Sequence, residues 1–294
     1  MTFERLALIG CGLMGGSFAL ALRQAGKVRH VAGFSASQGS RQKALHMGVI
    51  DEACDSIAQA VSGADLVLLA VPVAMTAQCL SQMEEALRPD ALIMDVGSTK
   101  CDVVEAARHA LGEHLPCFVP AHPIAGKEVA GVEHADAALY QDRLVILTPL
   151  PENTDTHVQL AQHVWQALGS QVEQLSAHDH DAAFAAVSHM PHLAAFALVH
   201  SLARQPNGAM YLSMAGPGFR DFSRIAASDP AVWRDILLAN RQEVLHQSSL
   251  MRHALDEFEQ AMQQQDAAKL ETLITQASQT RSQWQLCGSK KTTD

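Results

Sequence analysis

The 294-residue chain is poor in aromatic residues and in cations. It has only two Tyr and three Trp, and no Lys lies between Lys127 and Lys269. The 21 Lys and Arg are outnumbered by 31 Asp and Glu, so the formal net charge is −10. An acidic chain without a polybasic segment is a poor partner for nucleic acid or for an anionic membrane surface. We therefore predict no nucleic-acid partner and no membrane partner.

The sequence also lacks targeting and redox motifs. No two of its six cysteines form a CxxC pair, which is typical of reduced, cytoplasmic thiols. Glycines interrupt the apolar run near the N-terminus and no basic segment precedes it, so it does not read as a signal peptide. We see no other apolar run approaching the roughly 20 residues that cross a bilayer. These absences predict a soluble, cytoplasmic protein.

What the first half does contain is an alternation of short apolar runs and helical patterns. A helix is predicted at Leu13–Ala25, closed by Gly26. Alternation of this kind indicates a parallel sheet with right-handed crossovers, the Rossmann-type α/β class. The predicted strands are Leu6–Ile9, His30–Phe34, Leu66–Val71, Ala91–Val96, Cys117–Val119 and Leu144–Leu147.

The second half is rich in Ala, Leu, Gln, Glu and Met at helical spacing. Residues Val232–Gln263 read as a long helical pattern with one break. We therefore predict an α/β dinucleotide-binding domain over 1–175, an all-α domain over 176–286, and a flexible tail over 287–294.

A glycine-rich loop joins the first predicted strand to the first helix. It reads Gly10-Cys11-Gly12-Leu13-Met14-Gly15. In this context the first glycine allows a tight turn, the second lets the backbone approach a pyrophosphate, and the third allows close helix–strand packing. A glycine-rich turn without a ligand is the alternative. We assign Gly10, Gly12, Leu13, Met14 and Gly15 to cofactor binding, with Val71 and Pro72 where a later strand ends.

The acidic residue that usually holds the ribose 2′-hydroxyl of NAD is missing. No Asp or Glu occurs from Gly16 to Ile50, and Ser35 occupies the expected position. Hydroxyls and a nearby guanidinium accept a 2′-phosphate, so Ser35, Ser37 and Arg41 favour NADP, with NAD as the alternative. Arg41 as an ordinary solvated helix residue is the plainer interpretation.

Two segments that follow strands carry candidate catalytic groups. Ser98 lies in VGSTK, where it or Thr99 could instead cap a helix that begins at Lys100. His122 lies in HPIAGKE at the end of a predicted strand, where a histidine suits general-base catalysis on a hydroxyl. A purely structural histidine is the alternative.

Charged and imidazole groups recur in the second half. Helical spacing places His178, His189 and His192 on one face, which indicates a polar pocket wall in preference to a metal site, and we predict no metal. Arg220 and Arg224 lie one turn apart and could clamp a carboxylate, or could be surface charges paired with Asp221.

The absence of two residue patterns excludes two other choices of catalytic base. Dehydrogenases with a helical second domain often use a lysine there, and short-chain enzymes use a tyrosine with a lysine four residues later. Leu144 follows Tyr140 at that offset, and Ala215 follows Tyr211. Histidine remains as the base.

These motifs, taken in order, resemble the prephenate/arogenate dehydrogenases of tyrosine biosynthesis. The resemblance rests on the glycine loop, VGSTK, HPIAGKE, the His178-Asp179 pair followed by SHMPHLAAFAL, and FRDFSRIAASDPAVWRDILLAN, which cover residues 6 to about 243. It implies a Rossmann domain followed by a helical dimerisation domain, and therefore a homodimer. It also implies oxidative decarboxylation of a small cyclohexadienyl substrate with hydride transfer to the cofactor.

The resemblance also implies roles for individual residues. His122 matches the base, and Ser98 matches the serine that hydrogen-bonds this histidine and the substrate hydroxyl. Arg224 matches the arginine that binds a substrate carboxylate. The remaining positions of the predicted substrate pocket are Gly126, Glu128, His189, His192, Asp221 and Trp233.

Two rival interpretations remain. One is another two-domain dehydrogenase of the β-hydroxyacid type, against which the missing lysine argues. The other is a non-catalytic NADP-binding sensor, against which the presence of His122, Ser98 and Arg224 argues. The choice between prephenate and arogenate stays open.

Overall fold

The computed structural model describes residues 2–285 and divides the chain into two compact units. The first unit consists of the chain up to Asp181 together with Asp229–Asn240. The second consists of Ala182–Ser228 and the chain from Arg241 onward. The predicted boundary near residue 175 did not include the return of Asp229–Asn240 to the first unit. The predicted tail over 287–294 lies outside the described residues.

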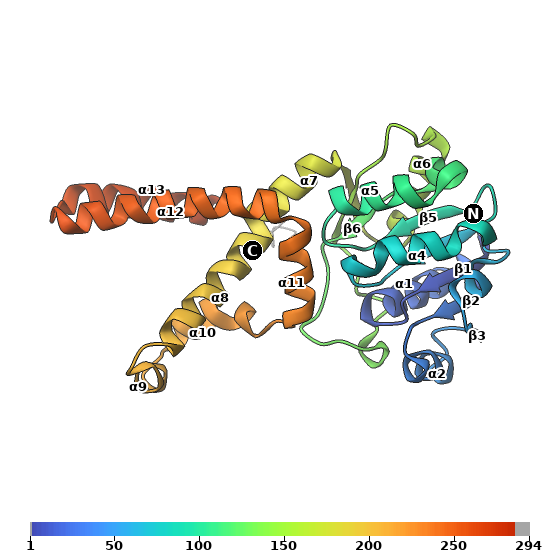
Figure 1. Ribbon diagram of the computed structural model, residues 1–294, viewed down its shortest axis with the longest axis horizontal. Helices are drawn as coiled ribbons and strands as arrows, with labels where there is room; N and C mark the ends of the chain where they lie inside the picture. The colour runs from blue at the N-terminus through green and yellow to red at the C-terminus, as the bar shows by residue number, and fades with distance from the viewer. Residues whose placement is uncertain (1, 286–294) are drawn as a thin grey trace, which may run out of the picture. The chain divides into compact units, whose positions relative to one another are not determined.

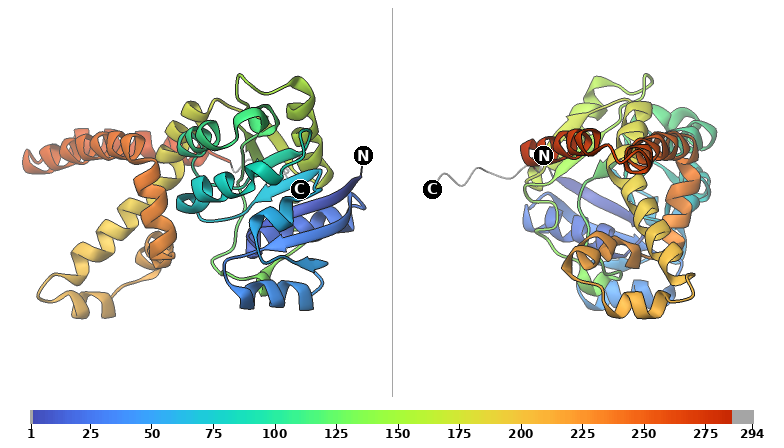
Figure 2. Two further views of the ribbon diagram at one scale, coloured as in Figure 1. Left: turned by 45° about the vertical axis from the view of Figure 1, so that its right-hand side comes forward. Right: turned by 90° about the vertical axis from the view of Figure 1, so that its left-hand side faces the viewer.

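A five-stranded parallel sheet forms the centre of the first unit (Figures 1 and 2). Its strand order is β3-β2-β1-β4-β5, so the chain reverses its direction of travel at β1. A doubly wound sheet with this order opens a crevice at the carboxyl ends of its strands, where the direction changes. The strands are β1 (Phe3–Ile9), β2 (Val28–Phe34), β3 (Glu52–Ala53), β4 (Leu66–Leu69) and β5 (Leu92–Asp95).

Helices cover both faces of this sheet because its strands are apolar on both sides. Alternate residues of β1 enter different cores, with Leu6 and Leu8 in one and Ala7 and Ile9 in the other. The first core contains α1 (Leu13–Gln24) and α6 (Asp155–Ala167); the second contains α3 (Ile57–Val61), α4 (Thr76–Met83) and α5 (Cys101–Ala110). Helix α2 (Gln38–His46) follows β2.

A smaller three-stranded sheet extends the unit. Strand β6 (Ala121–Pro123) pairs antiparallel with β7 (Leu144–Leu147), and β7 pairs parallel with β8 (Gln171–Gln174). The predicted strand Cys117–Val119 is wrong, because the 3₁₀ helix Gly112–Cys117 occupies its start and only Phe118 forms a bridge, with Ile93. The predicted parallel sheet is confirmed by the five-stranded sheet, and the antiparallel β6–β7 pair belongs to the separate three-stranded sheet.

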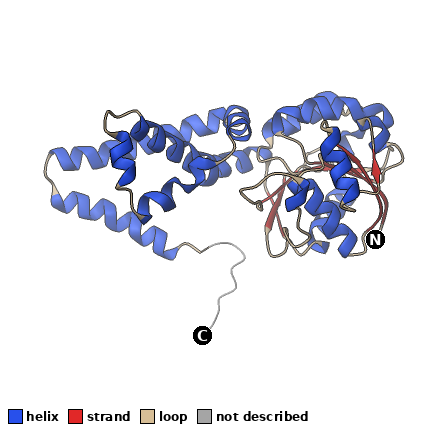
Figure 3. Cartoon of the chain, turned by 90° about the horizontal axis from the view of Figure 1, so that it is seen from below, coloured by secondary structure: helices blue, strands red, loops and turns tan. Residues whose placement is uncertain are grey.

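Figure 3 shows that the chain after β8 is helical. The break predicted within Val232–Gln263 is confirmed at Asn240, between α11 and α12. Asp229 caps α11 by accepting hydrogen bonds from the N–H groups of Ala231 and Val232. The helices are α7 (Ala177–Phe184), α8 (Met190–Ala203), α9 (Gly208–Ser213), α10 (Pro217–Ser223), α11 (Pro230–Ala239), α12 (Arg241–Gln263) and α13 (Ala267–Gln283).

A π-turn at Ala185–His189 joins α7 to α8. Pro191 causes it, because proline lacks an N–H group and its ring collides with the carbonyl four residues earlier. The N–H of Met190 consequently donates to the carbonyl of Ala185, five residues back. The extra residue in this turn breaks the regular helical spacing from which a shared face of His178 and His189 was predicted, and the two residues differ in burial, since His178 is exposed and His189 is buried.

The segment Ala177–Ala203 is 27 residues long and, by length and composition alone, apolar enough to cross a membrane. The prediction that no apolar run approaches this length is wrong. Only 17% of its most apolar window is buried within the chain. Core helices of soluble proteins pass the same test, and this segment carries His189, Pro191 and His192.

Candidate active site

The glycine loop adopts a backbone that side chains would obstruct. Gly10 has φ +104°, and a Cβ atom there would lie 2.1 Å from the carbonyl oxygen of Ala70. A Cβ atom at Gly15 would lie 2.2 Å from the carbonyl oxygen of Gly10. Gly12 differs from both, because a Cβ atom there would meet no atom within 4 Å. Two of the glycines therefore allow the chain to pack closely, and the third leaves space above the loop.

That space lies at the N-terminus of α1. Gly12 is the N-cap residue, no side chain caps the helix, and its first turn carries no acidic residue. A helix N-terminus presents backbone N–H groups and the positive end of the helix dipole, so it attracts phosphate. The loop therefore fits the pyrophosphate of a dinucleotide.

A cavity of about 670 Å³ opens beside this loop. It contains six of the predicted cofactor residues, which are Gly10, Gly12, Ser35, Ser37, Val71 and Pro72. Leu13 instead packs in the first core, and the carbonyl of Met14 accepts a hydrogen bond of 2.7 Å from the Tyr140 hydroxyl. Gly15 also does not line the cavity, which is consistent with its role in packing.

Basic and hydroxyl groups surround the end of the cavity near β2. Ser37 caps α2 by accepting from the N–H of Ser40, and Ser40 also lines the cavity. Lys43, which was not predicted as a site residue, lines it too and pairs with Glu133 at 2.9 Å. The predicted cofactor residue Arg41 does not itself line the cavity; its guanidinium lies 5.6 Å from the centre of the Phe34 ring, which does, and 3.4 Å from Asp55, so Arg41 is not simply solvated.

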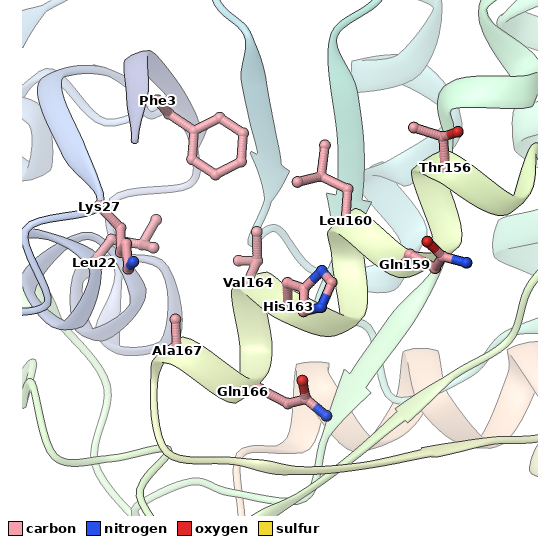
Figure 4. Close-up of a pocket in the computed structure, with 10 residues that line it drawn as sticks. All are labelled: Phe3, Leu22, Lys27, Thr156, Gln159, Leu160, His163, Val164, Gln166 and Ala167. Carbon is pink, nitrogen blue, oxygen red and sulfur yellow. The ribbon is translucent and has the colours of Figure 1, made fainter. Parts of the chain in front are cut away.

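A second pocket of about 600 Å³, drawn in Figure 4, lies elsewhere in the first unit. Phe3 at the start of β1 and residues of α6, including Leu160, His163 and Val164, line it. It contains none of the predicted site residues and no glycine loop. The cavity beside Gly12 is therefore the candidate cofactor site.

His122, the predicted base, lies in β6 opposite Ile146 of β7 and is half-buried. Its Nδ1 atom is 2.8 Å from Nε2 of His180 in α7. His180 is fully buried, and its Nδ1 atom is 2.8 Å from Oδ1 of Asp181. The two imidazole rings meet edge to face, with centroids 5.0 Å apart. His122, His180 and Asp181 thus form a continuous hydrogen-bonded row.

Asp181 is anchored by the start of α5. Its two carboxylate oxygens accept the N–H groups of Lys100 and Cys101, each at 2.8 Å, and Asn240 donates to its backbone carbonyl. Burial raises the pKa of Asp181, but the hydrogen bonds from His180, Cys101 and Lys100 outweigh burial and hold that pKa below its usual value. Burial lowers the pKa of His180 despite the neighbouring Asp181 carboxylate. The geometry therefore indicates an ionised Asp181 beside a neutral His180.

A second buried carboxylate lies at the end of β5. Asp95 accepts the N–H groups of Ala121 and Gly97, at 2.9 and 2.8 Å, and pairs with the fully buried ammonium of Lys100. Ser98, which follows Gly97 in the chain, is half-buried. Neither Ser98 nor Thr99 caps α5, as the alternative interpretation required, because α5 begins at Cys101 with Lys100 as its N-cap and no side-chain cap.

The remaining predicted pocket residues are divided between the units. Gly126 and Glu128 lie in the exposed loop after β6, and Trp233 lies in α11, all in the first unit. His189, His192, Asp221 and Arg224 lie in the second unit.

Within the second unit, Nδ1 of His192 is 2.9 Å from the carbonyl of Ser188, and burial lowers the pKa of His192. Asp221 pairs at 3.0 Å with Arg220, both being exposed, so the surface-charge interpretation holds for Arg220. Arg224 begins the 3₁₀ helix Arg224–Ala227 and is exposed. No group of three or more His, Cys, Asp or Glu residues within 2–285 is arranged to hold a metal ion.

His180 and Asp181 were not among the predicted site residues. The sequence pattern pointed instead to His178, two residues earlier, which is exposed. The helical spacing of the apolar residues Ala177, Phe184 and Ala185 could have indicated that positions 180 and 181 are buried, because they fall on the same face of α7. Two polar residues on the buried face of a helix require partners, and this requirement would have identified them.

A parallel sheet with a glycine loop at the start of α1, a cavity beside that loop and a positioned histidine are typical of a nicotinamide-dependent dehydrogenase. Comparison with family models identifies the family within this class. Residues 18–174 match the model described as prephenate dehydrogenase, nucleotide-binding domain, and residues 176–276 match the model described as prephenate dehydrogenase, dimerization domain. The chain belongs to the prephenate dehydrogenase family, whose members are NAD(P)-dependent oxidoreductases.

Individual relatives agree with this assignment. The chain is 34% identical to prephenate dehydrogenase of Bacillus subtilis over 91% of its length and 72% of the relative. It is 34% identical to cyclohexadienyl dehydrogenase of Zymomonas mobilis over 83% of both chains. A crystal structure of prephenate dehydrogenase from A. aeolicus, in complex with hydroxyphenyl propionate and NAD+, superposes with a TM-score of 0.90 at 34% identity. The match covers 96% of this chain and 98% of that one.

The structure predicts opposite consequences for two substitutions in the glycine loop. Gly12→Ala should leave the thermal midpoint unchanged, because its Cβ atom meets nothing within 4 Å. It should weaken NADPH binding by about tenfold or more, since the methyl group occupies the space that a pyrophosphate must enter. Gly10→Ala should instead lower the thermal midpoint, because its Cβ atom collides with Ala70.

Fluorescence titration with NADPH and thermal unfolding measure the two effects. Gly218→Ala is the matched control, since a Cβ atom there also meets nothing within 4 Å. Unchanged NADPH affinity in Gly12→Ala would exclude this loop as the pyrophosphate site.

Proposed function

We propose that this protein catalyses the oxidative decarboxylation of prephenate, arogenate or both, with His122 as the general base. The observation that carries the proposal is the hydrogen-bonded row of His122, His180 and Asp181 in the unit that also contains the cofactor cavity. A histidine held in one orientation is suited to taking a hydroxyl proton at neutral pH.

The chemistry follows from the substrate. A bound nicotinamide supplies the hydride acceptor. His122 takes the proton of the 4-hydroxyl as hydride leaves the same ring carbon, which becomes a carbonyl. Loss of the ring carboxylate as CO₂ sends its bonding electrons through the ring to this oxygen, which takes a proton back, and the ring becomes aromatic. Because aromatisation drives the reaction, the side chains mainly supply orientation and a base.

The other predicted residues complete this mechanism. Ser98 would orient the substrate hydroxyl and His122. The exposed guanidinium of Arg224 would bind a substrate carboxylate, and His189 with His192 would form a polar wall. Glu128, Asp221, Gly126 and Trp233 would lie around the pocket. Each of these residues lies in one of the motifs on which the family resemblance rests.

Relatives support both substrates. The Bacillus subtilis relative is named prephenate dehydrogenase, and a Synechocystis structure that superposes with a TM-score of 0.82 at 26% identity is named arogenate dehydrogenase. That match covers 95% of this chain and 99% of that one. A hydroxyacid dehydrogenase, 3-hydroxyisobutyrate dehydrogenase of Mycobacterium tuberculosis, shares the fold at 18% identity with a TM-score of 0.57. The absence of lysine between Lys127 and Lys269 disfavours that chemistry here.

Steady-state kinetics with prephenate and then arogenate, followed by cofactor reduction, test the proposal. His122→Asn should lower kcat by about 10²–10⁴-fold with little change in KM, because it removes the base and not the binding groups.

Arg224→Ala should chiefly raise KM, by roughly tenfold, because it removes a charge-assisted contact. Arg204→Ala, another exposed arginine of the second unit, is the control. Absence of turnover with both substrates would contradict the proposed function.

We also propose that NADP is preferred over NAD. Hydroxyls of Ser35, Ser37 and Ser40 and the ammonium of Lys43 line the cavity, and no acidic residue occurs from Gly16 to Ile50. A 2′-phosphate would compete with Glu133 for Lys43 and with Asp55 for Arg41. Charge-assisted hydrogen bonds to phosphate are among the stronger polar contacts.

Arg41→Ala should therefore weaken NADP binding by about tenfold while leaving NAD binding unchanged, because only NADP carries the 2′-phosphate. Calorimetric titration with each cofactor measures the difference. Arg23→Ala, whose guanidinium pairs with Asp51, serves as control; neither arginine lines the cavity, but Arg41 stacks on Phe34, which does. Tighter binding of NAD than of NADP by the unmodified protein would refute the preference.

Finally, we propose a homodimer formed through the second unit. The matching family model is a dimerization domain, and the apolar segment Ala177–Ala203 is largely uncovered. An apolar groove of about 600 Å³ runs between α8, α10 and α12, lined by Met190, Leu193, Leu198, Phe222, Met251 and Leu255. Exposed apolar area of this kind marks an interaction surface.

Light scattering coupled to size exclusion tests the homodimer. The unmodified protein should have the mass of two chains, and Leu255→Glu should yield monomers because it places a charge in the apolar groove. Leu45→Glu, at an exposed leucine of the first unit, should remain dimeric. A monomeric mass for the unmodified protein would rule the homodimer out.

A further inference from the structure

We propose that His180 is a positioning residue that fixes the tautomer of His122, so that Nδ1 of His122 carries the proton and Nε2 is the basic atom. This inference rests on the proposed function, in which His122 is the base. It assigns the protons along the row of His122, His180 and Asp181 from the distances and the burial of its members.

The assignment starts at Asp181, whose protonation state the structure fixes. Two backbone N–H groups at the start of α5 point to its carboxylate oxygens, one to each. An oxygen that accepts such hydrogen bonds is stabilised in the ionised form, and an ionised carboxylate can only accept. Nδ1 of His180, at 2.8 Å, must therefore donate to Asp181.

The second step follows from the number of protons on a neutral imidazole. His180 is fully buried, and a buried imidazole near the ammonium of Lys100 is disfavoured as a cation. A neutral ring carries one N–H group, so once Nδ1 of His180 holds the proton, its Nε2 atom is an acceptor. A contact of 2.8 Å between two ring nitrogens requires one proton between them. Nδ1 of His122 must supply that proton.

The third step concerns the base itself. With Nδ1 protonated, neutral His122 carries its lone pair on Nε2, which is the atom that can take a hydroxyl proton. After that transfer, the imidazolium still donates to His180, whose acceptor strength Asp181 enhances. The row thus holds the proton-accepting tautomer before the reaction and stabilises the charge formed during it, as a carboxylate does for the histidine of a serine-protease triad.

The intervening imidazole also moderates the field of the carboxylate. A carboxylate in direct contact with a histidine raises its pKa strongly, because it stabilises the charged form. Here a neutral ring separates Asp181 from His122, and Lys100 and Asp95 form a neutralised pair nearby. The arrangement orients His122 without placing a carboxylate in direct contact with it.

The alternative is that His180 only packs α7 against the start of α5. Two variants separate the alternatives. His180→Leu removes the acceptor for His122 and puts an apolar side chain in the buried position. His180→Gln instead places an amide oxygen within reach of His122. We expect His180→Leu to lower kcat by about 10²-fold with KM nearly unchanged, and His180→Gln to recover much of that loss. His200→Leu, at an exposed position of α8, is the control and should retain full activity.

A spectroscopic measurement tests the tautomer without relying on activity. In ¹⁵N-labelled protein, the ring nitrogens of His122, identified by their loss in His122→Asn, should show protonated Nδ1 and unprotonated Nε2 above the titration range. In His180→Leu this preference should be lost. Unaltered kcat in His180→Leu, or an unaltered His122 tautomer, would overturn the inference, as would equal losses in the Leu and Gln variants of a folded protein.

These outcomes are distinguishable from failure of the proposed function. If His122 is not the base, then His122→Asn leaves turnover intact, whereas the nitrogen shifts still report the contact with His180. If the function is right and the inference wrong, His122→Asn is impaired and His180→Leu is not.

Discussion

The buried carboxylate of Asp95 holds together the part of the first unit that carries the candidate base. It is only 2% exposed, so its charge requires compensation, which the Lys100 ammonium and the N–H groups of Gly97 and Ala121 supply. Loss of one partner from such a buried pair costs several kcal/mol, about 3–5 in typical cases. The end of β5, the start of β6 and the approach to α5 are therefore fixed at one point, one residue before His122.

Asp181 repeats this arrangement from a different part of the chain. It satisfies the first N–H groups of α5, which no local side chain caps, and it orients His180. A helix start and an imidazole are thereby fixed by the same two oxygens. Rigid placement of a reacting group contributes to catalysis because orientation need not be achieved during the reaction. The glycine loop acts independently of these charges. It would position a cofactor because its glycines let the backbone come close to the pyrophosphate.

The sequence predicted those features that depend on local patterns. Leu144–Leu147 is a strand as expected, since four consecutive apolar residues suit a buried strand, and the break before Arg241 was visible in the helical pattern. The strand expected at Cys117–Val119 failed because Pro116 lies in a 3₁₀ turn that ends at Cys117. His180 escaped notice because its partners His122 and Lys100 are distant in sequence, and no local spacing reveals such a contact. Arg41 was expected near a phosphate, but its pairing with Asp55 depends on where the segment after β3 folds.

The chain passes between the two units three times, after Asp181, after Ser228 and after Asn240. The first unit is consequently discontinuous, and it includes α11 and the buried Asn240, which come after α8, α9 and α10 in the chain. A fragment ending near residue 175 would keep the glycine loop and β6 but lose His180, Asp181 and Asn240. The nucleotide-binding part of this protein therefore cannot be excised at its apparent border without loss: it would retain the glycine loop and lose the residues that hold its candidate base.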